Sequence, residues 1–175
     1  SKVFYEKLLM LRTHGISKEL DKLTNKNEGP WFYEMQELGF NYRITDFQCA
    51  LGISQLKKLS DWVTRRRNIA AQYDNAFASI EGIEPLVVRK NVQHAYHLYV
   101  VRTGVNERGP ERAKIFKALH EHGIGVNVHY IPVHLHPFYR NRFKTGPGLC
   151  PVAEAAYQSL LSLPMFPLMS DTDVS

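Results

Sequence analysis

Residues 38–52 read Leu-Gly-Phe-Asn-Tyr-Arg-Ile-Thr-Asp-Phe-Gln-Cys-Ala-Leu-Gly, which is the densest pattern in the chain. Thr45 and Gln48 form a capping box, in which each side chain satisfies a free backbone N–H of the other, so a helix starts here. Asn41 and Arg43 come just before that start. Because helix N-termini favour negative charge and Arg adds a forked donor, this stretch can hold an anion. A tight loop with a solvated Arg43 is the alternative.

Apolar side chains at three- and four-residue spacing flank this stretch and predict helices. These are expected at residues 3–12, at residues 45–59, and from a Ser60-Asp61 cap to Gly82. Residues 17–30 are polar and contain Asn, Gly and Pro, which predicts a surface loop. The aromatic residues 31–40 predict an extended segment packed against a core.

After Pro85 the pattern changes to short strands and helices. Aromatic and β-branched runs predict the strands, whereas Pro at a start and Gly at an end predict the helices. In chain order we expect a strand at 96–102, a turn at 104–109, a helix from Pro110 to Gly123, a strand at 124–128, a loop at 129–150, a helix at 151–159 and a strand at 160–164. This alternation predicts a small α+β domain. A further helix signal follows Ser170, but the sequence stops at Ser175, so we expect no helix there.

The composition is that of an ordinary globular protein, with 175 residues, 44% of them hydrophobic, and 22 Lys and Arg against 17 Asp and Glu. It excludes disordered, collagen-like and disulfide-stapled proteins. No apolar stretch approaches the ~20 residues of a membrane span. Because the sequence shows two Cys and no signal pattern, we expect a reducing, cytoplasmic setting. The net charge of +5 suits an anionic partner such as phosphate.

Several patterns favour ordinary packing over a specialised role. Arg65-Arg66-Arg67 lie in a predicted helix, where neighbours point ~100° apart, so we expect a solvated or salt-bridged face. The aromatic strand at 96–102 lacks the Lys/Arg-Gly-Phe signature of an RNA-recognition domain, and we expect no nucleic-acid partner. Cys49 and Cys150 have no nucleophile motif around them.

The loop after the strand at 124–128 concentrates polar aromatic side chains. It offers the imidazoles of His129, His134 and His136, the phenols of Tyr130 and Tyr139, and the guanidinium of Arg140. Such a set suits a polar ligand such as a sugar. A metal site that also uses His94 and His97 is the alternative, but no Cys or carboxylate completes a recognised spacing, so we expect no metal.

Residues 38–52 strongly resemble the DegT/StrS family of sugar-nucleotide aminotransferases, which are pyridoxal-phosphate (PLP) enzymes of fold type I. Further landmarks in the family's order are Arg12-Thr13-His14-Gly15, His94 to Tyr99, and His129-Tyr130. The resemblance implies an α/β protein overall, of which this sequence is mostly the α+β small C-terminal domain plus connecting helices. It assigns residues 1–44 to the tail of the large PLP-binding domain and a dimer-interface loop, 45–79 to connecting helices, and 80–175 to the small domain, truncated before its last helix.

The resemblance also implies a homodimer with two shared active sites. In such enzymes the Asn of the Gly-aromatic-Asn-Tyr-Arg motif, here Asn41, reaches the phosphate of the partner subunit's PLP, and Arg43 lies near the cofactor or the nucleotide-sugar. The residues that border the sugar pocket would be His129, Tyr130, His136 and Tyr139.

Within the family, residues 126–134 look most similar to the pseudaminic acid biosynthesis enzymes, which move an amino group from glutamate to carbon 4 of a UDP-linked 4-keto-6-deoxy sugar. The family's Schiff-base Lys lies in a Ser-x-His-x-x-Lys segment that is not found in this sequence. We therefore expect a C-terminal fragment that holds no catalytic residue and is inactive alone. The alternative is a non-catalytic module that binds a nucleotide-sugar or a protein partner.

Overall fold

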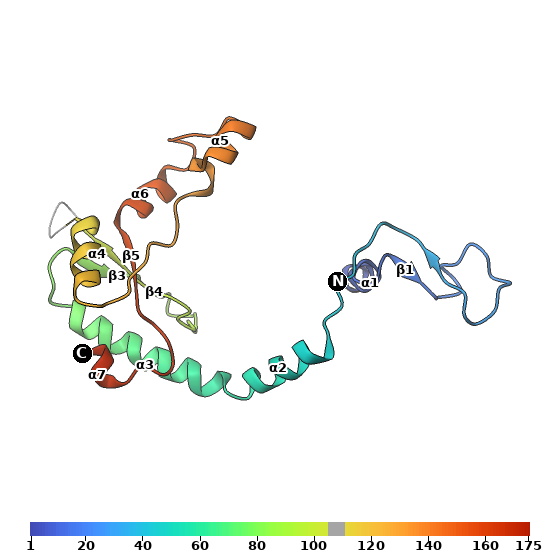
Figure 1. Ribbon diagram of the computed structural model, residues 1–175, viewed down its shortest axis with the longest axis horizontal. Coiled ribbons are helices and arrows are strands. Elements are labelled where there is room, and N and C mark those ends of the chain that lie inside the picture. Colours follow the sequence, from blue (N-terminus) through green and yellow to red (C-terminus); the bar gives the residue numbers. More distant parts are fainter. Residues whose placement is uncertain (105–110) are drawn as a thin grey trace. The chain divides into compact units, whose positions relative to one another are not determined.

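The computed structural model describes residues 1–104 and 111–175, which form two compact units, residues 1–57 and residues 58–175 (Figure 1). Each unit is described by itself. Except for Gly104, the turn predicted at 104–109 and the helix start predicted at Pro110 lie outside the described residues. Across the described ranges, no helix is both long enough and apolar enough to span a membrane.

The first unit consists of two helices and a minimal pair of strands. Its elements are α1 (Lys2–Leu11), β1 (Ile16–Ser17), β2 (Glu34–Met35) and α2 (Asp46–Leu56). The strands pair antiparallel, with Ile16 opposite Met35. Between them the loop folds back on Glu34, whose carboxylate accepts the backbone N–H groups of Thr24 at 2.7 Å and Asn25 at 2.8 Å. Of residues 31–40, which were expected to be extended, only Glu34 and Met35 form a strand.

The second unit packs one long helix against a three-stranded antiparallel sheet. Its elements are α3 (Leu59–Phe77), β3 (Ile83–Pro85), β4 (Tyr99–Thr103), α4 (Arg112–Glu121), η2 (Val133–Leu135), α5 (Pro137–Phe143), α6 (Pro151–Ser159), β5 (Leu160–Leu163) and α7 (Asp171–Val174). The strand order is β3-β4-β5. The helix predicted at 151–159 and the terminal strand are confirmed, as is the mixed α and β content of this part.

The core of the second unit lies between α3 and β4. Tyr99 and Val101 alternate with exposed or half-buried neighbours along β4 and so point to one face of the sheet. Ile69 and Tyr73, four residues apart on α3, face the same core. The Tyr73 and Tyr99 rings lie 4.9 Å apart. Burial of these large apolar side chains is the main stabilising term of the unit.

Four local predictions are wrong. The segment predicted as a loop at 129–150 contains η2 and α5. Residues 124–128 form no strand and contribute only an isolated bridge between Asn127 and Ser162. The long helix begins at Leu59 rather than after Ser60-Asp61, and its cap residue Lys58 makes no side-chain cap bond. A short helix, α7, does form after Ser170, because the Ser170 and Asp173 side chains close a capping box.

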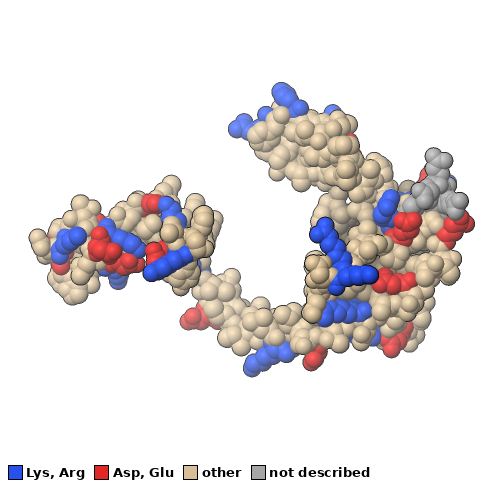
Figure 2. Space-filling model, turned by 180° about the vertical axis from the view of Figure 1, so that it is seen from behind, with Lys and Arg blue, Asp and Glu red and all other residues tan. Residues whose placement is uncertain are grey.

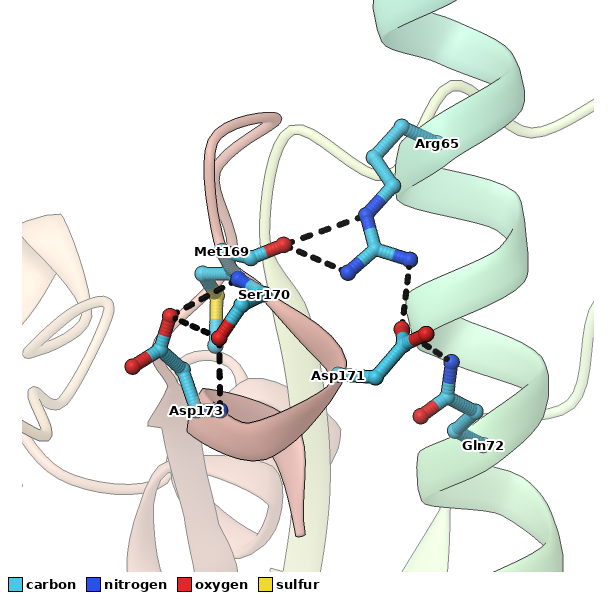
Figure 3. Close-up of polar contacts among 6 residues, drawn as sticks. All are labelled: Arg65, Gln72, Met169, Ser170, Asp171 and Asp173. Carbon is cyan, nitrogen blue, oxygen red and sulfur yellow. Dashed lines mark hydrogen bonds and ion pairs between the residues drawn. The ribbon is translucent and has the colours of Figure 1, made fainter.

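Of the solvated or salt-bridged face expected for Arg65-Arg66-Arg67, the salt bridge is found at Arg65, which pairs with Asp171, while all three arginines are half-buried. Arg65 donates from Nε to the carbonyl of Met169 at 3.1 Å and from Nη1 to Asp171 at 2.8 Å, which fastens α7 to α3 (Figure 3). Arg66 donates from one nitrogen to the carbonyls of Tyr96, His97 and Met165, at 2.8, 3.2 and 2.9 Å. The run therefore holds loops from distant parts of the sequence against one helix.

Candidate functional site

The segment that carries Asn41 is pinned against the end of α1. Phe40 donates its N–H to the carbonyl of Leu11 at 2.8 Å and accepts from the N–H of His14 at 2.9 Å, while Tyr42 donates to Arg12 at 2.9 Å. Thr13 and Asn41 form a β-bridge. The two sequence landmarks around Arg12 and Asn41 thus lie side by side.

This close approach requires two glycines. A Cβ on Gly39 would lie 2.1 Å from the backbone nitrogen of Gly15. A Cβ on Gly15, whose φ is +70°, would lie 1.8 Å from the carbonyl oxygen of Glu37. Because backbone atoms cannot move aside as a flexible side chain can, only glycine fits at either position.

The side chains of Asn41 and Arg43 meet on one side of this segment. Arg43 donates from Nε to Oδ1 of Asn41 at 3.1 Å, and both residues are exposed. The neighbouring rings of Phe40 and Tyr42 stack with centroids 5.0 Å apart and an interplanar angle of 12°. With its oxygen engaged, Asn41 offers its NH2 group, and Arg43 offers its terminal nitrogens.

The helix start beside these residues is already satisfied. Thr45 accepts the N–H of Gln48 at 3.3 Å and donates its own backbone N–H to the Gln48 side chain at 2.9 Å, so the predicted capping box is confirmed. Asp46 adds a negative charge to the first turn of α2. The donors that suit a phosphate are therefore the Asn41 amide and the Arg43 guanidinium more than the helix dipole, and these two groups fit an oxyanion.

The other predicted site residues lie in the second unit and fall into two groups. His129 and Tyr130 are neighbours with edge-to-face rings, and Nδ1 of His129 lies 2.8 Å from Oγ of the buried Ser162. His136 is the N-cap residue of α5, and Tyr139 on that helix stacks on Phe143 with centroids 6.0 Å apart. Tyr130 is 73% exposed and open to a ligand.

Glu154 is a residue that the sequence reasoning missed. Its Oε1 lies 2.7 Å from Nε2 of His134, and its carboxylate accepts the N–H groups of Gly148 at 2.9 Å and Cys150 at 3.2 Å. The Gly148 N–H, followed by the His134 ring, holds the pKa of the Glu154 carboxyl below its usual range. One feature of the sequence could have drawn attention to Glu154, because it is the only Asp or Glu between Glu121 and Asp171.

The stretch between Asn127 and Leu160, which contains η2, α5 and α6, is called the projection here. Apart from Glu154, its side chains are basic or neutral. Its cationic side chains are Arg140, Arg142 and Lys144. Figure 2 shows blue side chains at the outer end of this projection and tan over most of the rest. Within the described ranges, no group of three or more His, Cys, Asp and Glu side chains is arranged to hold a metal ion.

Comparison with known proteins gives a consistent result. The family model described as the DegT/DnrJ/EryC1/StrS aminotransferase family matches residues 2–175. The spore coat polysaccharide biosynthesis protein SpsC of Bacillus subtilis is 40% identical over 170 residues, which are 97% of this chain and 43% of SpsC.

Solved structures resemble the chain over 99% of its length. PseC of Helicobacter pylori, an aminotransferase involved in the biosynthesis of pseudoaminic acid, gives a TM-score of 0.81 at 28% identity, with 44% of PseC covered. The PLP-form of Spr1654 from Streptococcus pneumoniae gives 0.81 at 27% identity, with 41% covered. The chain has part of the α/β architecture of these fold type I PLP aminotransferases, as the sequence predicted, and spans less than half the length of the proteins it matches.

Proposed function

The chain belongs to the DegT/DnrJ/EryC1/StrS aminotransferase family, and from this we propose that it is the C-terminal part of a PLP-dependent sugar-nucleotide aminotransferase. The reaction we propose moves an amino group from glutamate to the C4 keto group of a UDP-linked 4-keto-6-deoxy sugar. The product would serve cell-surface glycan synthesis of the pseudaminic acid type. The similarity to PseC and to the polysaccharide protein SpsC supports this substrate class.

The paired donors of Asn41 and Arg43 are the observation that carries the proposal. An exposed amide NH2 fixed beside an exposed guanidinium suits a phosphate monoester, because both groups present N–H donors to oxyanion oxygens. Asn41 would hold the phosphate of the partner subunit's PLP, and Arg43 would neutralise charge on the cofactor or the nucleotide-sugar. When bound, PLP supplies the electron sink that lets the amino group leave glutamate and join the sugar.

The sugar side is assigned to His129, Tyr130, His136 and Tyr139. These residues provide ring nitrogens and phenolic hydroxyls, the groups that bind sugar hydroxyls, on a projection whose free charges are positive. A positive surface suits the diphosphate of a UDP-sugar. We assign no catalytic residue to these 175 residues, which we propose are inactive without the portion that carries the Schiff-base Lys.

The proposed assembly is a homodimer that shares its two active sites. In this proposal residues 1–44 belong to the large domain and the dimer interface, residues 45–79 form the connecting helices, and residues 80–175 belong to the small domain. The structure itself divides between Lys57 and Lys58, inside the proposed connecting part. We place the enzyme in the cytoplasm, where the free thiols of Cys49 and Cys150 would stay reduced.

The test is an assay of the complete polypeptide with PLP, glutamate and a panel of 4-keto sugar nucleotides. The expected product is a 4-amino sugar nucleotide with equimolar 2-oxoglutarate, seen by mass spectrometry. A complete polypeptide that lacks a cofactor-bonding Lys and transfers no amino group, yet binds UDP-sugars, would overturn the proposal in favour of the binding module.

A further inference from the structure

The projection between Asn127 and Leu160 has no buried residue. It comprises η2, α5 and α6 and their connections, and it includes all four proposed sugar-pocket residues. A segment without an apolar core of its own owes its conformation to specific polar contacts and opens easily when these are lost. The polar contacts therefore determine how the pocket residues are presented.

Hydrogen bonds from Thr103 to the carbonyl of Ser159 and from Arg112 to the carbonyl of Tyr157 hold the end of the projection, and three further polar contacts involve its histidines. His129 lies 2.8 Å from Ser162 on the buried strand β5, at the point where the chain leaves the sheet. His134 in η2 is held twice, by the Glu154 carboxylate at 2.7 Å and, through its carbonyl, by the Thr145 hydroxyl at 2.8 Å.

Glu154 is the centre of this arrangement. From the first turn of α6 it accepts hydrogen bonds from the connection before that helix, at Gly148 and Cys150, and from η2 at His134. The side chains of His134 and Glu154 are 10% and 21% exposed, so the pair is shielded from solvent although the residues around it are open. The Glu154 carboxylate thus links three segments by hydrogen bonds. These are η2, the connection between α5 and α6, and α6 itself.

We propose that Glu154 is a positioning residue for the sugar-nucleotide, which holds η2 and α5 so that Tyr130, His136 and Tyr139 face the substrate. This inference rests on the proposed function. All four contacts of the carboxylate point into the projection, and it is the only acidic residue from 122 to 170. The negative charge of Glu154 faces hydrogen-bond donors within the projection. The positive charges of Arg140, Arg142 and Lys144 therefore remain available to an anionic substrate.

A purely structural role for Glu154 predicts something different. If the carboxylate only anchored the connection before α6, its loss would weaken the whole enzyme and affect both substrates alike. A positioning role affects the sugar-nucleotide and spares glutamate and the cofactor, because misplacement of a substrate-orienting group by about 1 Å can lower a rate by up to ~100-fold.

The experiment compares Glu154→Gln with Glu121→Gln in the complete PLP-loaded enzyme. Glu121 is a matched control, since it is an exposed glutamate on α4 that pairs with Lys117 at 3.8 Å, one turn away on the same helix. We expect Glu154→Gln to raise the KM for the sugar-nucleotide about tenfold. We expect the change in cofactor absorbance on adding glutamate to keep its wild-type rate, and Glu121→Gln to leave both measurements unchanged.

A second pair of variants tests the contact itself. His134→Gln keeps an N–H donor toward Glu154 and should retain most of the wild-type KM, whereas His134→Leu should reproduce the Glu154→Gln effect. An unchanged sugar KM in Glu154→Gln, or equal losses in both half-reactions, would overturn the positioning role. If the wild-type enzyme transfers no amino group, the proposed function fails instead. Hydrogen exchange then decides whether Glu154 holds the projection, because Glu154→Gln must lower the protection of residues 129–150.

Discussion

Arg43 donates a hydrogen bond from Nε to Oδ1 of Asn41 at 3.1 Å, two positions away along an extended segment. Alternate side chains of such a segment point the same way, which brings these two together and leaves Phe40 and Tyr42 to stack with each other. The bond orients the amide, so that its NH2 group is the end available to a ligand.

Asn41→Asp should weaken PLP binding in the complete enzyme. The change keeps the shape of the side chain but replaces an N–H donor with a negative charge that repels a phosphate. We expect the Kd for PLP to rise by at least about tenfold, the factor that ~1.4 kcal/mol represents, measured by absorbance titration. Asn68→Asp on the exposed side of α3 introduces the same charge and should leave this Kd unchanged. Equal affinities for Asn41→Asp and wild type would contradict the role of Asn41.

Gly39→Ala should destabilise the chain, whereas Gly52→Ala should not. The new Cβ at 39 meets backbone atoms of His14 and Gly15 at 2.6 and 2.1 Å, but at 52 it meets nothing within 4 Å. We expect a loss of about 1–3 kcal/mol for Gly39→Ala and a gain of about 0.5–1 kcal/mol for Gly52→Ala inside α2. Urea unfolding measures both, and a similar effect of the two substitutions would show that the 15–39 contact is not tight.

Ile69→Ala should be among the most damaging core substitutions in the second unit. Ile69 is 0% exposed and packs between α3 and the sheet, so its truncation leaves a cavity as well as losing apolar burial. The expected cost is about 2–5 kcal/mol in the free energy of unfolding. Leu168→Ala removes a side chain that is 85% exposed and should stay within about 0.5 kcal/mol of wild type. Calorimetry of both variants tests the position of the core.

The contact between α7 and α3 should weaken in acid. Hydrogen bonds from Gln72 and then Arg65 hold the pKa of Asp171 below its ordinary value of 3.8 (Figure 3). A carboxyl with a lowered pKa stabilises the folded state above its unfolded pKa, and this contribution is lost as the pH falls through the folded pKa. Asp171→Asn should therefore be less stable than wild type near pH 6, by a small amount because Asp171 is exposed.

That difference should shrink as the pH falls below 3.8 and through the lowered pKa of Asp171, because the wild-type carboxyl then becomes neutral. Urea unfolding of both proteins between pH 6 and pH 2.5, at low ionic strength, provides the comparison. A stability difference that does not change over this range would mean that the Asp171 charge is not what joins α7 to Arg65.

Much of the local structure follows from the sequence alone. The Thr45–Gln48 capping box and the helix at residues 151–159 involve residues only a few positions apart, so their hydrogen bonds form wherever the local sequence permits them. The anion-binding interpretation of Asn41 and Arg43 also came from neighbours in the chain. The structure adds that the glycines at 15 and 39 bring this segment against α1.

Other features depend on partners that are distant in sequence. Residues 124–128 have strand-like composition, yet only Asn127 forms a bridge, to Ser162 on the edge strand β5, and its neighbours do not continue the pairing. The Arg66 side chain binds carbonyls at 96, 97 and 165, and no spacing within its own helix indicates those acceptors. A helical wheel can say only that the three arginines point in different directions.

The sequence by itself determined the family, the helix start at Thr45 and the residue types suited to a phosphate and a sugar, since these depend on side-chain chemistry and on hydrogen bonds between near neighbours. Only the tertiary structure decided that Glu154 meets His134 and that Arg65 meets Asp171. The first pair forms where the chain folds back between residues 134 and 154, and the second where packing on α3 brings distant segments together. The energy of that packing is spread over many apolar contacts that no short motif records.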